Sequence, residues 1–337
     1  MKAVGYHTSL PIDHADSLLD LELPLPVAKG RDILVEVKAI SVNPVDAKIR
    51  LRRAPAEGKP EVLGWDVSGV VSAIGDAVTG FKPGDRVWYA GALTRPGGNS
   101  EFHLVDERIV GHMPRSLDFA QAAAMPLTAI TAWELLFDRL EVSRDKTAQG
   151  KSLLVIGAAG GVGSILLQLA RQLTGLTVIA TTSRPESGER LRELGAHHVI
   201  DHGLPLAAEI ERLGLPPVNY VAGLNQTDKH FEQIIALMAP QGKLGLIDDP
   251  ELIDVRKLKG KALSLHWEMM FARSLFQTDD MQQQQSLLNE VARLVDAGVI
   301  RTTFKETLGK INAANLKQAH ALIESNASTG KIVLEGF

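Results

Sequence analysis

A glycine-rich turn at residues 157–163 is the segment of this chain whose residue spacing could bind a phosphate. The turn, Gly-Ala-Ala-Gly-Gly-Val-Gly, follows the apolar run Leu153–Ile156 and leads into Val162–Leu173, which has a helical period. Strand, glycine turn and helix in this order are the context in which a dinucleotide pyrophosphate is bound. Gly160 would let the backbone approach the pyrophosphate, and Gly163 would let the helix pack close to the strand.

The helix that starts in this turn would offer unpaired backbone N–H groups and a partial positive charge to the phosphates. The residues predicted to bind the cofactor here are Gly157, Ala158, Gly160, Gly161, Val162 and Gly163. The turn departs from the strict G-x-G-x-x-G form, because alanine stands at the first glycine and the glycine comes one place earlier. A tight structural turn in another α/β fold is the alternative interpretation.

The end of the next predicted strand, Thr177–Thr182, indicates which dinucleotide is bound. An NAD-binding fold has an acidic residue about 20 residues after the turn, which binds the ribose 2′-hydroxyl. Here Ser183 and Arg184 stand in that place, where they could bind a 2′-phosphate. One charge-assisted hydrogen bond contributes roughly 1.5–3 kcal/mol. The sequence therefore predicts NADPH, and an exposed surface arginine is the alternative.

Composition excludes several classes of protein. The 337 residues include no Cys, which rules out disulfides and thiolate zinc sites and favours a cytoplasmic setting. The net charge is −4, so no nucleic-acid partner is predicted. The uncharged run 152–170 approaches the length of a membrane span. Its glycines favour a strand, a turn and a helix instead, so no membrane partner is predicted.

The chain changes character near residue 128. The first third contains short β-rich runs separated by turn signals, whereas strands and amphipathic helices alternate from Lys151 onward. Continuous apolar strands between such helices predict an α/β fold with a doubly wound parallel sheet. We expect residues 129–270 to form this Rossmann dinucleotide-binding domain. Residues 1–128 and 271–337 would form a β-rich catalytic and substrate domain around it.

Several motifs carry a resemblance to a known family. The segment Gly64–Gly75 has the spacing of the G-H-E-x₂-G-x₅-G signature of medium-chain zinc alcohol dehydrogenases. Phe81–Val87 resembles the same superfamily's turn, and Gly330–Leu334 resembles its closing strand. Asn43-Pro-Val-Asp46 resembles the zinc-free quinone oxidoreductase (zeta-crystallin-like) branch. The resemblance spans essentially the whole chain and is closest to the subgroup named zinc-type alcohol dehydrogenase-like protein.

The resemblance carries expectations about architecture. It implies that the β-rich domain is GroES-like and that the active site lies in a cleft between the two domains. It also implies a homodimer that pairs through the edge strand near Leu263–Trp267. By resemblance, His202 lies beside the adenosine phosphate, and we include Ile247, which ends the predicted strand Lys243–Ile247, among the cofactor-binding residues.

The family's metal positions are altered in this sequence. The catalytic zinc of the relatives is bound by Cys, His and Cys, and the resemblance puts Asn43, Trp65 and Leu127 at these positions. Indole and leucine side chains cannot ligate zinc, so no zinc is predicted. Three clustered histidines, His197, His198 and His202, make a metal site conceivable elsewhere, but only one carboxylate accompanies them.

Loss of the metal would remove the Lewis acid that holds a carbonyl oxygen. The predicted function is therefore NADPH-dependent hydride delivery to a quinone or an α,β-unsaturated carbonyl. Such acceptors develop only a delocalised negative charge, which hydrogen-bond donors can stabilise. Two alternatives stay open: a non-catalytic NADPH-binding redox sensor or structural protein, and a zinc-dependent alcohol dehydrogenase.

Five residues are the candidates for the substrate site. Asn43 is the leading hydrogen-bond donor, although it could instead contact the cofactor or be a turn residue before proline. Thr131 is a second candidate near the cofactor, and Tyr89 is a candidate pocket wall or proton donor. Trp65 and Trp267 could stack on a flat substrate, although tryptophan more often belongs to a core.

Overall fold

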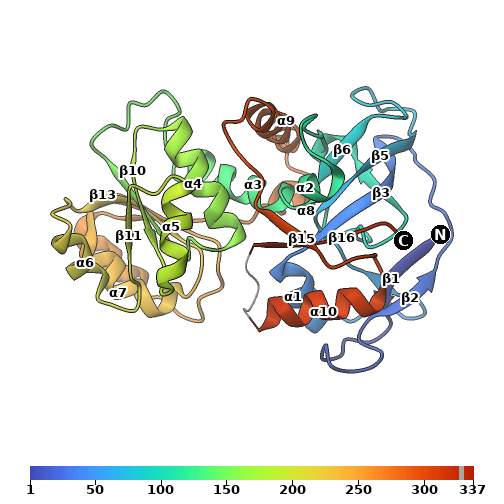
Figure 1. The fold of residues 1–337 in the computed structure, drawn as a ribbon, viewed down its shortest axis with the longest axis horizontal. Helices are drawn as coiled ribbons and strands as arrows, with labels where there is room; N and C mark the ends of the chain where they lie inside the picture. The colour runs from blue at the N-terminus through green and yellow to red at the C-terminus, as the bar shows by residue number, and fades with distance from the viewer. Residues whose placement is uncertain (326–329) are drawn as a thin grey trace. The chain divides into compact units, whose positions relative to one another are not determined.

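The computed structural model describes residues 1–325 and 330–337. The chain forms two compact units, one made of Met1–Ile130 with Phe271–Phe337 and the other of Thr131–Met270. In Figure 1 the blue and red ends of the chain belong to the first unit, and the green-to-orange middle forms the second. A β-rich unit with a separate doubly wound parallel sheet is the predicted α/β architecture, which is confirmed.

The second unit is built on a six-stranded sheet in which every pair of neighbouring strands is parallel. Its strands, in spatial order, are β11 (His198–Ile200), β10 (Thr177–Thr181), β9 (Ser152–Ile156), β12 (Val218–Gly223), β13 (Met238–Leu246) and β14 (Ser264–Trp267). The chain runs outward from β9 on one side and then returns to build the other side. This reversal creates a switch point beside β9, where open α/β sheets bind their ligands at the carboxyl ends of the strands.

Helices cover both faces of this sheet. They are α4 (Gly161–Leu173), α5 (Pro185–Glu193), α6 (Leu206–Arg212) and α7 (Thr227–Leu237), and a 3₁₀ helix (Val255–Lys261) precedes β14. In Figure 1, α4 and α5 lie on one face, and α6 and α7 on the other. The central strands are almost continuously apolar because both of their faces are buried, as in Leu154, Val221 and Leu244.

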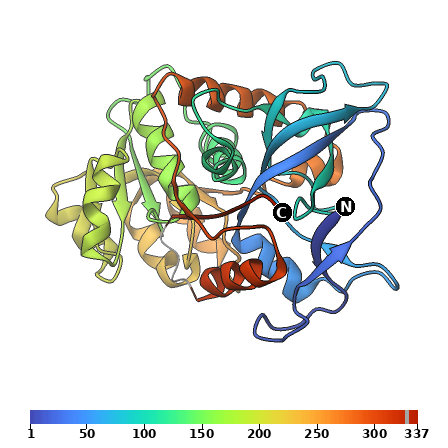
Figure 2. The same cartoon turned by 45° about the vertical axis from the view of Figure 1, so that its right-hand side comes forward.

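The first unit contains two sheets. The larger follows the order β15 (Phe304–Thr307), β16 (Lys331–Glu335), β3 (Asp32–Val42), β5 (Val67–Ile74), β6 (Arg86–Tyr89) and β8 (Gly111–His112), with β7 (Phe102–Asp106) also paired to β3. The smaller sheet has the order β2 (Leu19–Glu22), β1 (Lys2–Tyr6) and β4 (Glu61–Val62). In Figure 2 the red C-terminal strand runs beside the blue strand β3.

The remaining helices connect these sheets and the second unit. They are α1 (Pro44–Arg52), a 3₁₀ turn (Glu107–Ile109), α2 (Phe119–Ala123), α3 (Pro126–Trp133), a π-helical segment (Glu134–Arg139), α8 (Ala272–Phe276), α9 (Gln283–Asp296) and α10 (Ala313–Glu324). Pro126 begins α3, where a missing N–H costs nothing. Among the described residues, no helix is both long and apolar enough to cross a membrane.

Candidate functional site

The glycine turn lies at the carboxyl end of β9, at the switch point of the parallel sheet. Gly157 follows the strand with φ of +80°, a left-handed conformation that glycine adopts without strain. Its backbone N–H donates to the Thr181 hydroxyl (3.2 Å) at the end of the neighbouring strand β10. The turn is therefore tied to the adjacent βα connection.

Two other glycines meet different requirements. A Cβ at Gly163 would lie 2.4 Å from the Ala158 carbonyl oxygen and 2.6 Å from the Ala158 Cα, so α4 packs directly on the turn. A Cβ at Gly160 would come no nearer than 3.6 Å to any protein atom, which leaves open space in front of this backbone. Gly160 is also the N-cap of α4, and no side chain caps that helix. Its first N–H groups are thus available to a phosphate, and the turn fits a dinucleotide.

The end of β10 presents the residues predicted to select the cofactor. Ser183 and Arg184 are both exposed there. The Arg184 backbone N–H donates to the Thr182 hydroxyl (3.1 Å), which fixes the connection to α5. The ring Nδ1 of His202 lies 3.0 Å from the Thr181 hydroxyl, so His202 belongs to the same edge of the sheet as the glycine turn.

The next two strands complete this edge. Ile247 follows β13 directly and is half-buried, and its N–H donates to the Gly223 carbonyl (3.1 Å) at the end of β12. The structure thus gathers the predicted cofactor residues along the carboxyl ends of the parallel strands. It adds Thr181, whose hydroxyl contacts both Gly157 and His202, and which carried no sequence signal beyond its β-branched strand.

A second cluster of polar side chains lies in the first unit and is almost fully buried. Asn43 precedes α1, Asp66 precedes β5 and Lys331 begins β16. The Lys331 ammonium donates to Asn43 Oδ1 and to Asp66 Oδ2 (2.9 Å), and Asn43 Nδ2 donates to Asp66 Oδ2 (2.9 Å) and to the Ser41 carbonyl (3.2 Å). The other oxygen of Asp66 accepts the Leu127 N–H (2.7 Å).

The antiparallel pairing of β16 with β3 explains this meeting. Ile332 lies opposite Val42 in the register, so the neighbouring Lys331 reaches the residue that follows β3. Asn43, Asp66 and Lys331 are 2%, 0% and 6% exposed, so their charges are withdrawn from water. Lys331 is the main residue that the sequence analysis missed. Its only signal was its place in the Gly330–Leu334 segment that resembles the closing strand.

Burial perturbs the two carboxyl groups of this cluster. Burial raises the pKa of Asp66, and the Lys331 ammonium works in the opposite direction. Asp46, in the first turn of α1, accepts the backbone N–H of Asn43 (2.7 Å). Burial raises the pKa of Asp46 to about 7, with the Asn43 N–H and Lys331 opposing it. The cluster thus combines one ammonium, two carboxyl groups and one amide in a water-poor environment.

The remaining substrate-site candidates lie in different environments. Trp65 is fully buried, donates its indole N–H to the Ala92 carbonyl (3.3 Å) and packs edge-on against Phe271. Thr131 is buried in α3. Trp267 ends the edge strand β14, and about half of it is exposed.

Tyr89 is fully buried, and its hydroxyl lies 3.0 Å from Nδ1 of His103. His103 Nε2 lies 2.9 Å from the Pro96 carbonyl, which can only accept, so Nε2 carries the proton and Nδ1 accepts from the tyrosine. Burial lowers the pKa of His103 to about 4 and raises that of Tyr89 well above its ordinary value. The Tyr89 hydroxyl proton is therefore held by a neutral histidine.

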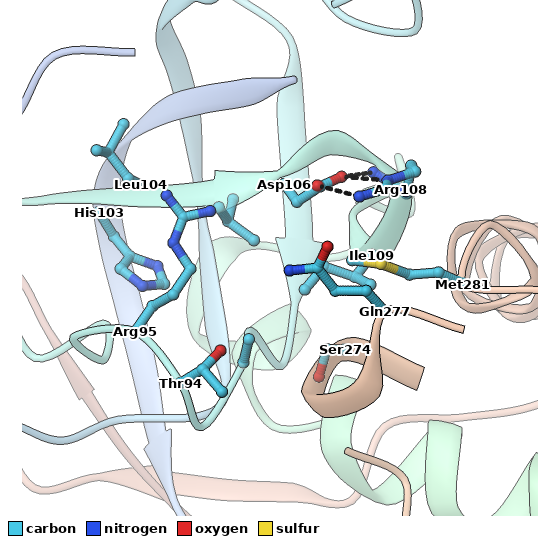
Figure 3. A pocket seen from close by; sticks show the side chains of 12 residues that line it. Thr94, Arg95, His103, Leu104, Asp106, Arg108, Ile109, Ser274, Gln277 and Met281 are labelled. Carbon is cyan, nitrogen blue, oxygen red and sulfur yellow. Dashed lines mark hydrogen bonds and ion pairs between the residues drawn. The ribbon is translucent and has the colours of Figure 1, made fainter. Parts of the chain in front are cut away.

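A small pocket of about 80 Å³ opens next to His103 in the first unit. Figure 3 shows the Asp106–Arg108 ion pair on one side of it and His103 with Arg95 on the other. Ligand sites for drug-sized molecules usually measure about 300–1,000 Å³. This pocket is too small for a quinone, and we assign it no substrate.

Comparisons with known proteins agree with this architecture. Residues 29–115 match the alcohol dehydrogenase GroES-like domain, and residues 194–334 match the zinc-binding dehydrogenase model. A Staphylococcus epidermidis zinc-type alcohol dehydrogenase-like protein is 35% identical, with 99% of each chain covered. The chain therefore belongs to the medium-chain dehydrogenase/reductase superfamily of oxidoreductases, as the motifs indicated, with a GroES-like and a Rossmann unit.

Two solved structures are also similar. A Rhizobium etli protein assigned to the zinc-dependent alcohol dehydrogenases is 57% identical with a TM-score of 0.97, covering 100% of this chain and 98% of its own. A quinone oxidoreductase of Pseudomonas syringae pv. tomato is 26% identical with a TM-score of 0.85, covering 99% of both chains. Relatives of this chain thus carry both zinc and quinone names.

The side chains present do not fit the zinc that some of these names imply. Of the three positions that the resemblance gives to zinc ligands, Trp65 uses its only polar atom as a donor and Leu127 has none. The third, Asn43, turns its carbonyl oxygen to a lysine ammonium. Within the described ranges, no group of three or more His, Cys, Asp or Glu side chains could hold a metal ion.

Proposed function

We propose that this protein is an NADPH-dependent oxidoreductase that delivers hydride to a quinone or an α,β-unsaturated carbonyl without catalytic zinc. The observation that carries the cofactor assignment is the uncapped glycine turn at the switch point, with Ser183 and Arg184 at the end of β10. A 2′-phosphate would form an ion pair with the Arg184 guanidinium, whereas a 2′-hydroxyl would have no carboxylate at this position to accept its hydrogen bond.

The chemistry of the former metal positions supports the choice of acceptor. Reduction of a simple aldehyde needs strong polarisation of its carbonyl oxygen, which a catalytic zinc would provide. The side chains at the three ligand positions, Asn43, Trp65 and Leu127, are poorly suited to hold that zinc. A quinone or an enone takes hydride at carbon and spreads the charge over a conjugated system. The similarity to a quinone oxidoreductase points to the same acceptor class.

Each part of the chain would have a defined task in this reaction. Bound NADPH would supply the hydride from its nicotinamide ring. The N–H groups of the turn from Gly160 would hold the pyrophosphate, and Arg184 and Ser183 would hold the 2′-phosphate. His202 and Ile247, on the same edge of the sheet, would line the cofactor. Asn43, Tyr89 and Thr131 stay candidates for the reacting centre, and Trp65 and Trp267 for the substrate pocket.

The decisive experiment measures NADPH oxidation at 340 nm with a panel of quinones, enones and enals. We expect turnover of at least one class, with NADH a poorer donor. Tight NADPH binding without turnover of any acceptor would favour the redox sensor or structural protein. Metal analysis of protein purified without a chelator accompanies the assay, and stoichiometric zinc that activity requires would overturn the zinc-free assignment.

We also propose that the protein acts as a homodimer in the cytoplasm. Among the described residues, β14 pairs with a strand on one side only, and it ends in the half-exposed Trp267. A second copy of β14 could continue the sheet there. Light scattering coupled to size-exclusion chromatography tests the dimer, and an introduced β14 proline should shift it toward monomer. The absence of Cys supports the cytoplasmic setting.

A further inference from the structure

The buried ammonium of Lys331 lies where the superfamily signature places metal ligands. We propose that Lys331 is the fixed positive charge of the substrate site, and that its ammonium holds the developing oxyanion of the acceptor. The proposal rests on the proposed function, because it assigns a role within that reaction. It names a catalytic residue that the sequence motifs did not suggest.

The hydrogen bonds of Asn43 are already made, so the ammonium of Lys331 is better placed than this amide to hold the oxyanion. Its two N–H bonds are already donated, one to Asp66 Oδ2 (2.9 Å) and one to the Ser41 carbonyl (3.2 Å). Its oxygen accepts from Lys331. A substrate oxygen would have to displace one of these buried acceptors to gain a bond from Asn43, which would leave that acceptor unpaired.

The hydrogen bonds of Lys331 lead to the opposite conclusion. An ammonium has three N–H donors. Two of them are donated to acceptors among the described residues, Asn43 Oδ1 and Asp66 Oδ2. No acceptor among the described residues takes the third N–H, so a ligand oxygen could accept it. The two anchors also fix the direction of the ammonium, since both are themselves held by other bonds.

Lys331 forms a buried ion pair with Asp66, whose Oδ2 lies 2.9 Å from its ammonium. Asp66 shares its two oxygens among three donors, which are the Leu127 N–H, the Asn43 amide and Lys331. These bonds hold the ammonium in one place, and a preorganised N–H donor in a water-poor site stabilises a nearby oxyanion. In a metal-dependent relative, the metal ion would supply this stabilisation of the oxyanion.

The step balances as a conjugate reduction. Bound NADPH would supply the hydride that forms the new C–H bond at the β-carbon and would leave as NADP⁺. The alkene electron pair moves to the carbonyl oxygen, which becomes an enolate oxygen held by the Lys331 N–H. A proton from water then adds to the α-carbon. For a quinone, hydride added to a ring carbon would give an enolate whose oxygen accepts the same N–H. Loss of the proton on that carbon and protonation of both oxygens by water would then give the hydroquinone.

The alternative is a purely structural ion pair that ties β16 to β3 and never meets a ligand. A probe that needs neither cofactor nor turnover separates the two. 4-Nitrophenol reports its own ionisation by visible absorbance, and its phenolate resembles the oxyanion of a reduced quinone. A cation in the site lowers the pKa of bound nitrophenol, whereas a structural pair leaves it unchanged.

The experiment titrates 4-nitrophenol with the cofactor-free wild type, Lys331→Met and Lys331→Arg. We expect the wild type to bind the phenolate about tenfold more tightly than the phenol, Lys331→Met to lose this preference, and Lys331→Arg to keep part of it. Lys261→Met is the matched control. The Lys261 ammonium donates its three hydrogens to the carbonyls of Ile235, Ala236 and Met238, so none is left for a ligand. The Lys261→Met variant should therefore bind 4-nitrophenol like the wild type.

A second measurement guards against a methionine variant that fails to fold. With ¹⁵N-lysine-labelled wild type, the side-chain resonance that is missing from Lys331→Arg should shift when 4-nitrophenol is added. No preference for phenolate in the wild type, or no shift of this resonance, would overturn the role of Lys331. Both measurements omit NADPH and the acceptor, so their failure would refute the role of Lys331 alone. Failure of the acceptor panel would instead refute the proposed function.

Discussion

Gly163→Ala tests the assignment of the phosphate-binding turn, because the structure gives this glycine a purely steric reason. The added Cβ would lie 2.4 Å from the Ala158 carbonyl oxygen and 2.6 Å from its Cα. Both are backbone atoms of the turn itself, so no side chain can rotate away. Helix α4 must move off the turn or the turn must deform.

Overpacking of this kind costs typically about 1–3 kcal/mol. The melting temperature of a unit of roughly 150–250 residues falls by about 2–4 °C for each kcal/mol. We therefore expect Gly163→Ala to melt several degrees below the wild type without cofactor. It should also bind NADPH more weakly, because the N–H groups of α4 are displaced from the pyrophosphate.

Gly160→Ala is the matched control, since its Cβ would have no protein atom within 3.6 Å. Alanine is a poorer N-cap than glycine, so the cofactor-free protein should lose less than about 1 kcal/mol. NADPH affinity should nevertheless fall, because the methyl group would occupy the space in front of the turn. Calorimetry and titration of NADPH fluorescence measure both effects. A Gly163→Ala variant as stable as the wild type would refute the close packing, and a Gly160→Ala variant with unchanged affinity would refute the pyrophosphate site.

Three further predictions concern the cofactor and the pH dependence of stability. Arg184→Asp should lower the NADPH-to-NADH ratio of kcat/KM about ten- to a hundredfold, whereas Arg190→Asp on the exposed face of α5 should leave it unchanged. Burial beside Glu134 raises the pKa of Glu268 from 4.5 to about 9, so the native state keeps a proton that the unfolded chain releases. The free energy of unfolding should then fall as pH rises from about 5 to 9, and Glu268→Gln should flatten this slope in urea melts. Burial beside Arg50 lowers the pKa of His320 from 6.5 to about 3, so the unfolded chain takes up a proton first. Stability should therefore fall as pH drops below about 6.5, and an equally steep fall in His320→Asn would contradict this origin.

The local structure around the glycine turn was largely predictable from the sequence. The segment from β9 through α4 to β10 is continuous along the chain, so glycine spacing and apolar runs describe it directly. The predicted strand Thr177–Thr182 matches β10 to within one residue. Local patterns suffice here because the βαβ unit is built from neighbouring segments.

The substrate side was much less predictable. Tyr89 was predicted as a pocket wall or proton donor, but nothing in the sequence linked its hydroxyl to the ring of His103. Trp65 took the place of a ligand in the motif, and only packing showed that its indole is fully buried. Such facts depend on which side chains meet after folding.

The sequence by itself determined the class of fold, the position of the glycine turn, the Ser183–Arg184 pair after β10 and the absence of thiolate ligands. Each of these depends on residue type and short-range spacing. Only the tertiary structure decided that Lys331 stands beside Asn43 and Asp66, which are 288 and 265 residues away along the chain. The pairing of the last strand with β3 brings them together, and no local pattern records a strand register set by the packing of a whole sheet.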